Sequence, residues 1–240
     1  GASGEAALDL STTLMDKVAT STFSKIVVGH ESGGHATATS HLRVGATNAP
    51  DQFSVMTALE LYGGQITFED YSNPNFVFAV NNTLKIDAAT TIVFRNEVEA
   101  TRPITIYSAN GSVSQALGSP NLDNRSTEAV RAPSLTVRAA TGIDMPWTEI
   151  NALQAENVGA GNLLVNVLPV RDTVFSQSVT GDVNVIGVAQ TTSGGGNVTV
   201  STSTRSIRLP ETIDLNLAAF SGVTPTTTNV IQTSGVTTAS

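Results

Sequence analysis

Three histidines within twelve residues could form a metal site. They stand at His30, His35 and His41, and Glu31 adds a carboxylate. Clustered imidazoles bind Zn²⁺ or Ni²⁺ in proteins. The zinc-protease pattern HExxH, however, needs two histidines four residues apart on a helix, whereas His30 and His35 are five apart and separated by a helix-breaking glycine pair. We therefore interpret the segment as a polar corner loop between two strands, and keep the three histidines as weak candidates for metal ligands.

Pairs of carboxylates are the second group that could do chemistry. Glycoside hydrolysis uses two carboxyl groups about 5 to 9 Å apart, and several carboxylates on one face can also bind Ca²⁺. The candidate pairs are Asp144 with Glu149, Asp172 with Asp182, and Glu69 with Asp70. None forms a dense cluster, and no motif fixes any pair. We interpret most of them as solvated turn residues.

Other motifs with a chemistry of their own are incomplete. The calcium-binding β-roll pattern GGxGxD needs an acid that the glycine run 194–196, followed by Asn197, does not supply. The chain has no phosphate-binding glycine loop, no dinucleotide fingerprint and no recognisable Ser-His-Asp order. The sequence therefore predicts no cofactor, no catalytic residue and no enzymatic activity.

Composition narrows the function further. Twelve Lys and Arg against twenty Asp and Glu give a formal net charge of −8, which argues against nucleic-acid binding. Absence of cysteine excludes disulfides and thiolate metal sites. With 40% hydrophobic and only 13% charged residues, the chain can build a core, and Ser, Thr, Asn and Gly must supply its polar surface. No apolar run reaches the roughly 20 residues of a membrane-spanning helix. No targeting signal is visible, so we expect a processed precursor or a piece of a longer protein.

Short strands must position these side chains. The recurring unit is apolar-x-apolar, rich in β-branched residues and bounded by Gly, Asn, Pro or Ser. It occurs at residues 26–28, 42–44, 66–68, 84–86, 92–94, 104–106, 135–137, 163–165, 183–185, 198–200 and 213–215. Intervals of 15 to 20 residues between several units indicate a solenoid, in which each coil pairs with the coils before and after it. We predict an all-β solenoid of about ten to twelve coils, roughly 50 Å long.

Three segments fit the strand pattern less well. Residues 11–18 and 147–155 have apolar residues at helical spacing, so a helix stays an alternative in each. Residues 223–240 are rich in Thr and carry no charge, which is typical of a linker, although residues 230–231 could add one strand. We therefore divide the chain into a solenoid over residues 1–222 and a tail over 223–240.

Several segments resemble a known family. They read LDLSTTL at 8–14 followed by FSKIVVG at 23–29, LTVRAATGI at 135–143, INALQAEN at 150–157, GDVNV at 181–185 and GGNVTV at 195–200. Together they resemble the filamentous-haemagglutinin-like β-repeats of large bacterial exoproteins and adhesins, over most of residues 7–217. The resemblance implies a right-handed parallel β-helix in a secreted or cell-surface protein, and it favours a coil over a helix after Gly142. Trp147, residues 95–97 and residues 30–41 depart from the pattern, which leaves a standard shaft and a specialised end both open.

The sequence thus favours a non-enzymatic, extracellular structural or adhesive segment. Its partners would be copies of itself assembled into a filament, neighbouring repeats of a longer chain, or a cell surface or polysaccharide. The alternative is a carbohydrate-active β-helix enzyme or carbohydrate-binding module. That alternative predicts that Trp147, Tyr62 or Tyr107 lines a groove beside two acids about 5 to 9 Å apart.

Overall fold

The computed structural model describes residues 8–10, 23–37, 39–45, 52–69, 77–116, 130–168, 182–191, 196–202, 205–208 and 231–232. All regular secondary structure in these residues is β-strand, which confirms the all-β prediction for them. The described residues therefore include no helix that is long and apolar enough to cross a membrane.

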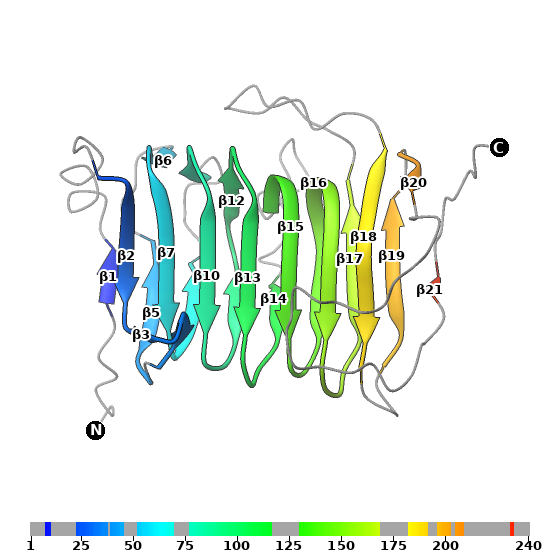
Figure 1. The fold of residues 1–240 in the computed structure, drawn as a ribbon, viewed down its shortest axis with the longest axis horizontal. Coiled ribbons are helices and arrows are strands. Elements are labelled where there is room, and N and C mark those ends of the chain that lie inside the picture. Colours follow the sequence, from blue (N-terminus) through cyan, green and yellow to red (C-terminus); the bar gives the residue numbers. More distant parts are fainter. Residues whose placement is uncertain are drawn as a thin grey trace.

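Nearly all described strands join one parallel sheet whose strands lie side by side along the long axis (Figure 1). The chain returns to the same position about every third strand, so the pairings fall into three stacks, which we call stack 1, stack 2 and stack 3. Short apolar-x-apolar segments form such strands because alternate side chains enter the core while β-branched residues suit the pleated backbone.

Stack 1 is a long run of parallel strands. It contains β2 (Lys25–Gly29), β7 (Ala58–Gly63), β10 (Leu84–Ala88), β13 (Ile104–Ser108), the second half of β15 (Val130–Ala139), the end of β16 (Ile143–Asn157) and β18 (Val183–Gln190). A further strand, β20 (Ile207–Arg208), pairs with the first two residues of β18.

Stacks 2 and 3 follow the same parallel order. Stack 2 contains β1 (Leu8–Leu10), β5 (His41–Val44), β8 (Gln65–Phe68), β11 (Ile92–Phe94), β14 (Val113–Gln115), the start of β16, β17 (Leu163–Val167), β19 (Val198–Thr202) and β21 (Ile231–Gln232). Stack 3 contains β6 (Gln52–Val55), β9 (Val77–Val80), β12 (Glu97–Ala100), the start of β15 and the middle of β16.

The core consists of columns of aliphatic side chains that face each other from the three stacks. In stack 1, one column runs through Leu59, Leu84, Ile104, Leu135 and Leu153, each at most 1% exposed. Continuous burial of this kind is the main stabilising contribution in a fold whose turns contact only their neighbours.

Aromatic rings and a close backbone contact complete the packing of the turns. The rings of Phe68 and Phe94 stack in neighbouring turns with centroids 4.9 Å apart. Gly29, with φ of 97°, lies so close to Tyr62 that a Cβ would stand 1.8 Å from the Tyr62 carbonyl oxygen. Only glycine fits that position, which is the last residue of the first described strand of stack 1.

The structure confirms the positions of the predicted strands better than the predicted spacing between them. Ten of the eleven strand segments are strands in the structure, and the eleventh, 213–215, lies outside the described residues. The interval from Leu84 to Ile104 is a true repeat, because these residues register directly in stack 1. The other short intervals compared strands of different stacks. Ile26 registers with Leu59, whereas Leu42 registers with Ile66, so the interval of 16 residues between Ile26 and Leu42 is no repeat.

The real repeat is longer and less regular than the predicted one. In stack 2, registered neighbours are 20 residues apart at Ile143 and Leu163 but 35 apart at Leu163 and Val198. Stack 2 contains nine strand segments in the described part of the chain, fewer than the ten to twelve coils expected. At about 4.8 Å per turn they span roughly 40 Å.

The structure also decides one of the two helix alternatives. Residues 147–155 lie in β16, where Ala152 to Asn157 pair with β15 on one side and β18 on the other. A helix there was therefore wrong, because the backbone hydrogen bonds go to neighbouring strands. Residues 11–18 lie outside the described residues. Residue 230 also lies outside the described residues. In the tail, β21 at Ile231–Gln232 pairs with β19. The domain boundary at residue 222 stays a prediction.

Candidate functional site

The structure separates the three histidines. His41 Nε2 lies 2.8 Å from Thr67 Oγ1 in stack 2, His30 Nδ1 bonds Thr37 Oγ1, and His35 Nδ1 lies 2.9 Å from Asp87 Oδ2. Among the described residues, no group of three or more His, Asp or Glu side chains is arranged to hold a metal ion. The histidines therefore support different parts of the fold instead of converging on one ion.

The predicted corner loop around residues 30–41 contains a small hairpin. Strands β3 (Glu31–Ser32) and β4 (His35–Ala36) pair antiparallel around a two-glycine turn. Gly33 and Gly34 both have positive φ, 62° and 82°, as a tight two-residue hairpin turn requires. The two glycines, which argued against a helix, thus form the turn of a hairpin that the sequence analysis did not predict.

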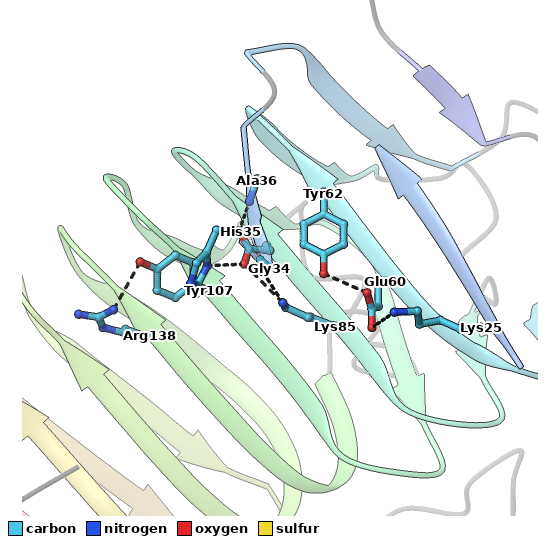
Figure 2. Close-up of polar contacts among 10 residues, drawn as sticks. Lys25, Gly34, His35, Ala36, Glu60, Tyr62, Lys85, Tyr107 and Arg138 are labelled. Carbon is cyan, nitrogen blue, oxygen red and sulfur yellow. Dashed lines mark hydrogen bonds and ion pairs between the residues drawn. The ribbon is translucent and has the colours of Figure 1, made fainter. Parts of the chain in front are cut away.

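This hairpin lies on the outer face of stack 1 and is fastened mainly to one carboxylate (Figure 2). Asp87 Oδ1 accepts a hydrogen bond of 2.8 Å from the Ala36 amide, and Asp87 Oδ2 faces His35. Lys85 Nζ donates to the Gly34 carbonyl oxygen at 2.5 Å. The Asp87 side chain is only 1% exposed, so these donors replace the water that a free carboxylate would bind.

Asp87 belongs to an outward column of polar and aromatic side chains. The column passes from strand to strand through Tyr62, Asp87, Tyr107, Arg138 and Glu156. Such cross-strand neighbours are near enough to interact in a sheet. Arg138 Nε lies 3.0 Å from Glu156 Oε2, so the column continues with an ion pair beyond the aromatic rings.

Side chains of the protein already cover both tyrosine rings. The His35 ring lies 4.4 Å from that of Tyr107, and the Arg138 guanidinium lies 5.4 Å from the same ring. Lys85 Nζ lies 5.0 Å from the centre of the Tyr62 ring, and Tyr62 is only 2% exposed. Tyr62 therefore offers no free face on which a sugar would stack, and the partly buried Tyr107 ring already contacts two side chains of the protein.

The first two described strands of stack 1, β2 and β7, carry a smaller network of ionisable groups. Tyr62 Oη donates to Glu60 Oε2 at 2.9 Å, and Lys25 Nζ lies 3.0 Å from Glu60 Oε1. Burial alone would raise the pKa of Glu60, but the hydrogen bonds from Lys25 and Tyr62 lower it overall. Burial, and then the hydrogen bond to Glu60, raise the pKa of the Tyr62 phenol.

At the other end of the column, burial has the opposite outcome. Glu156 is 1% exposed, and its desolvation raises the pKa of the carboxyl group although the neighbouring Arg138 lowers it. A carboxyl group with a raised pKa is one feature of catalytic acids, but a structural ion pair produces it as well. The partner of Glu156 is Arg138 on the neighbouring strand β15, and an ion pair between adjacent strands favours the structural role.

A second ionic cluster lies on the outward side of stack 3 and is wholly buried. Glu99, Arg131 and Glu149 occupy the same register position on three successive strands, and Glu97 precedes them on β12. Arg131 Nη1 bonds Glu97, while Nη2 donates to Glu149 Oε1 at 3.1 Å. The side chains of Arg131, Glu97 and Glu149 are 9%, 7% and 0% exposed. Burial would lower the pKa of Arg131, but the charges of Glu97 and Glu149 raise it overall.

Of the predicted carboxylate pairs, only Asp144 and Glu149 both lie within the described residues, and β16 places them on different stacks. Glu149 bonds Arg131, whereas Asp144 is exposed on the part of β16 that belongs to stack 2. Asp182 pairs with Arg208, and Glu69 lies 2.6 Å from Arg43 Nε. Asp70 and Asp172 lie outside the described residues.

The acids that do matter were missed by the sequence reading. Asp87 and Glu156 lie on stack 1, and Glu97 and Glu99 lie on stack 3. A signal was available for Asp87 and Glu156, since each follows an apolar-x-apolar unit at an outward position. None was available for Glu97 and Glu99, because nothing in the sequence separates a buried charged strand from a loop.

Trp147 does not join the two tyrosines. It lies on β16 at the corner that leads from stack 2 into stack 3, where Gln115 binds its backbone amide at 2.8 Å and its carbonyl oxygen at 2.6 Å. Tyr62 and Tyr107 both lie on stack 1. The three aromatic residues therefore do not line one groove, and the carbohydrate alternative gains no support from their positions.

No family model, no curated protein and no solved structure matches the chain. In both clusters the ionisable groups bond to each other, which is typical of side chains that hold strands and a hairpin in place.

Proposed function

We propose that the chain is a right-handed parallel β-helix that acts as a non-enzymatic structural or adhesive segment of an extracellular or cell-surface protein. Such a segment extends a rod and presents its outer faces for contact with a surface, a neighbouring repeat or another copy. The resemblance to filamentous-haemagglutinin-like repeats supports the bacterial, extracellular part of the proposal.

One observation carries the proposal: parallel pairing continues through three stacks around an aliphatic core. Each turn contacts the turns before and after it, so the fold can be extended or shortened by whole turns. A core of this kind gives length and stiffness without a central cavity for a substrate. The single column from Leu59 to Leu153, at most 1% exposed over five turns, illustrates that continuity.

The burial and the bonding of the carboxylates support a structural role over a catalytic one. General acid–base catalysis needs a group that can reach a substrate proton. Asp87 and Glu149 are 0% exposed and engaged with the Ala36 amide and Arg131, respectively. Their bonds fix a hairpin and a strand register.

Two measurements on the full chain test the proposal. Small-angle X-ray scattering should give an elongated particle, and beads coated with the chain should adhere to cells or polysaccharide surfaces more than beads coated with the heat-unfolded chain. Incubation with a panel of polysaccharides should release no new reducing ends or unsaturated sugars. A compact spherical particle would contradict the rod, and release of sugar products that is lost in Glu156→Gln would contradict the non-enzymatic role.

A further inference from the structure

The large hydrophobic side chains that are exposed in the described part of the chain lie at the two ends of the stacks. Phe23 precedes β2 and Val27 lies within it; Met56 follows β6; Ile186 lies in β18. These residues are 58%, 46%, 57% and 58% exposed, respectively. β2 and β6 are the first described strands of stacks 1 and 3, and β18 is the last of stack 1 but for β20, which pairs with its first two residues.

The two ends differ in how well they cover the core. At β2, Ile26 and Val28 continue the columns of Leu59 and Leu61, yet both are only partly buried. At the other end, Val185 and Val188 continue the columns of Leu153 and Ala155 and are only 4% and 3% exposed. The core is therefore open at β2 and closed at β18.

The second feature of β2 is its backbone pairing within the described part of the chain. Among the described strands, β2 pairs with β7 alone, so one edge of Lys25–Gly29 has no strand partner there. An unpaired, apolar strand edge is a template for a strand of another chain. The only charge within β2 is that of Lys25, which Glu60 already balances, so two such edges would not repel each other.

We infer that two copies of this chain associate through β2, which pairs antiparallel with β2 of the second copy about a two-fold axis at Val27. In that register Val27 faces Val27 of the second copy, and Ile26 lies opposite Val28 of the second copy. Each copy thus continues the open core columns of the other. A head-to-tail filament would instead need a second open end, and the closed columns at β18 do not provide one.

This inference rests on the proposed rod but can fail independently of it. Sedimentation equilibrium of the full chain should show a concentration-dependent dimer. Val27→Glu places a charge at the two-fold axis and should weaken dimerisation at least about tenfold. Ile186→Glu, a change of the same type at a similarly exposed position, should leave the dimer intact. Loss of association in both variants would indicate head-to-tail stacking, and a wild-type monomer would equally overturn the inference.

A cross-link tests the axis itself and does not depend on whether the charged variant folds. The chain has no cysteine, so Val27→Cys introduces a single thiol. Residues directly opposite each other in an antiparallel pair have Cα atoms about 4.5 to 5.5 Å apart, within the range of a disulfide. Mild oxidation should convert Val27→Cys to a covalent dimer at a rate at least about tenfold above that of Ile186→Cys. Equal rates would overturn the inference, whereas scattering from the Val27→Glu monomer still tests the rod separately.

Discussion

The ionic clusters of stack 1 and stack 3 use the same kinds of side chain for different purposes. In stack 3, Arg131 joins Glu97 and Glu149 inside the protein, and none of the three side chains is more than 9% exposed. In stack 1, buried Asp87 holds a hairpin whose His35 side chain is 57% exposed. The cluster on stack 3 connects successive strands of the sheet, and the cluster on stack 1 fastens the hairpin to the outer face. Loss of the stack 3 cluster should therefore unfold the sheet, whereas loss of the stack 1 cluster should release the hairpin alone.

The largest effect is expected from Arg131→Met. Methionine nearly fills the space but leaves Glu97 and Glu149 buried without the cation they share, which costs about 3–5 kcal/mol for buried pairs. Urea unfolding at pH 7 should show this loss of unfolding free energy. Arg43→Met is the matched control, because Arg43 is 50% exposed beside Glu69 and should change stability by less than about 1 kcal/mol. Equal losses in the two variants would show that burial does not make the Arg131 ion pairs more important than the exposed pair of Arg43 with Glu69.

The same comparison explains which strands could be predicted from the sequence. Strands of stacks 1 and 2 alternate apolar residues with exposed or half-exposed polar ones, as in Ile104–Ser108. Stack 3 breaks this rule. In Val77–Val80 and Glu97–Ala100 every residue is buried, so alternation disappears, and residues 95–97 departed from the expected repeat pattern. The third side of the fold was missed for that reason.

The candidate sites were harder to predict than the strands. The hairpin of residues 31–36 depends on a contact with Asp87, some fifty residues later, which no local pattern reveals. Arg131 likewise finds Glu97 only because residues 34 apart fall on neighbouring turns. Turns of unequal length, from 20 to 35 residues in stack 2, prevent such pairs from being read off a fixed repeat.

A smaller and local effect is expected from Asp87→Asn. The amide keeps one acceptor for the Ala36 N–H but loses the charge that faces His35 and Lys85. Hydrogen exchange at the Ala36 amide should accelerate about tenfold or more, because the hairpin opens without the rod. The urea transition should move little. Thr136→Val, on the same outward face two strands beyond Lys85, should leave Ala36 exchange unchanged; a global loss of protection in Asp87→Asn would show that this contact holds the rod itself.

The smallest effects are expected from the pH dependence of two carboxyl groups in stack 1. The fold lowers the pKa of Glu60 below 4.5, so its contribution to stability is present above that pH and is lost as the pH falls. The fold raises the pKa of Glu156, so its ionisation works against folding as the pH rises above 4.5. Urea unfolding at pH 3.5 and pH 7 should therefore show opposite trends. Relative to the unsubstituted chain, Glu60→Gln should lose stability as the pH rises and Glu156→Gln should gain it. A gain in both variants would mean that burial, and not the partners Lys25 and Tyr62, governs Glu60. A loss in both would mean that the ion pair with Arg138 outweighs burial at Glu156.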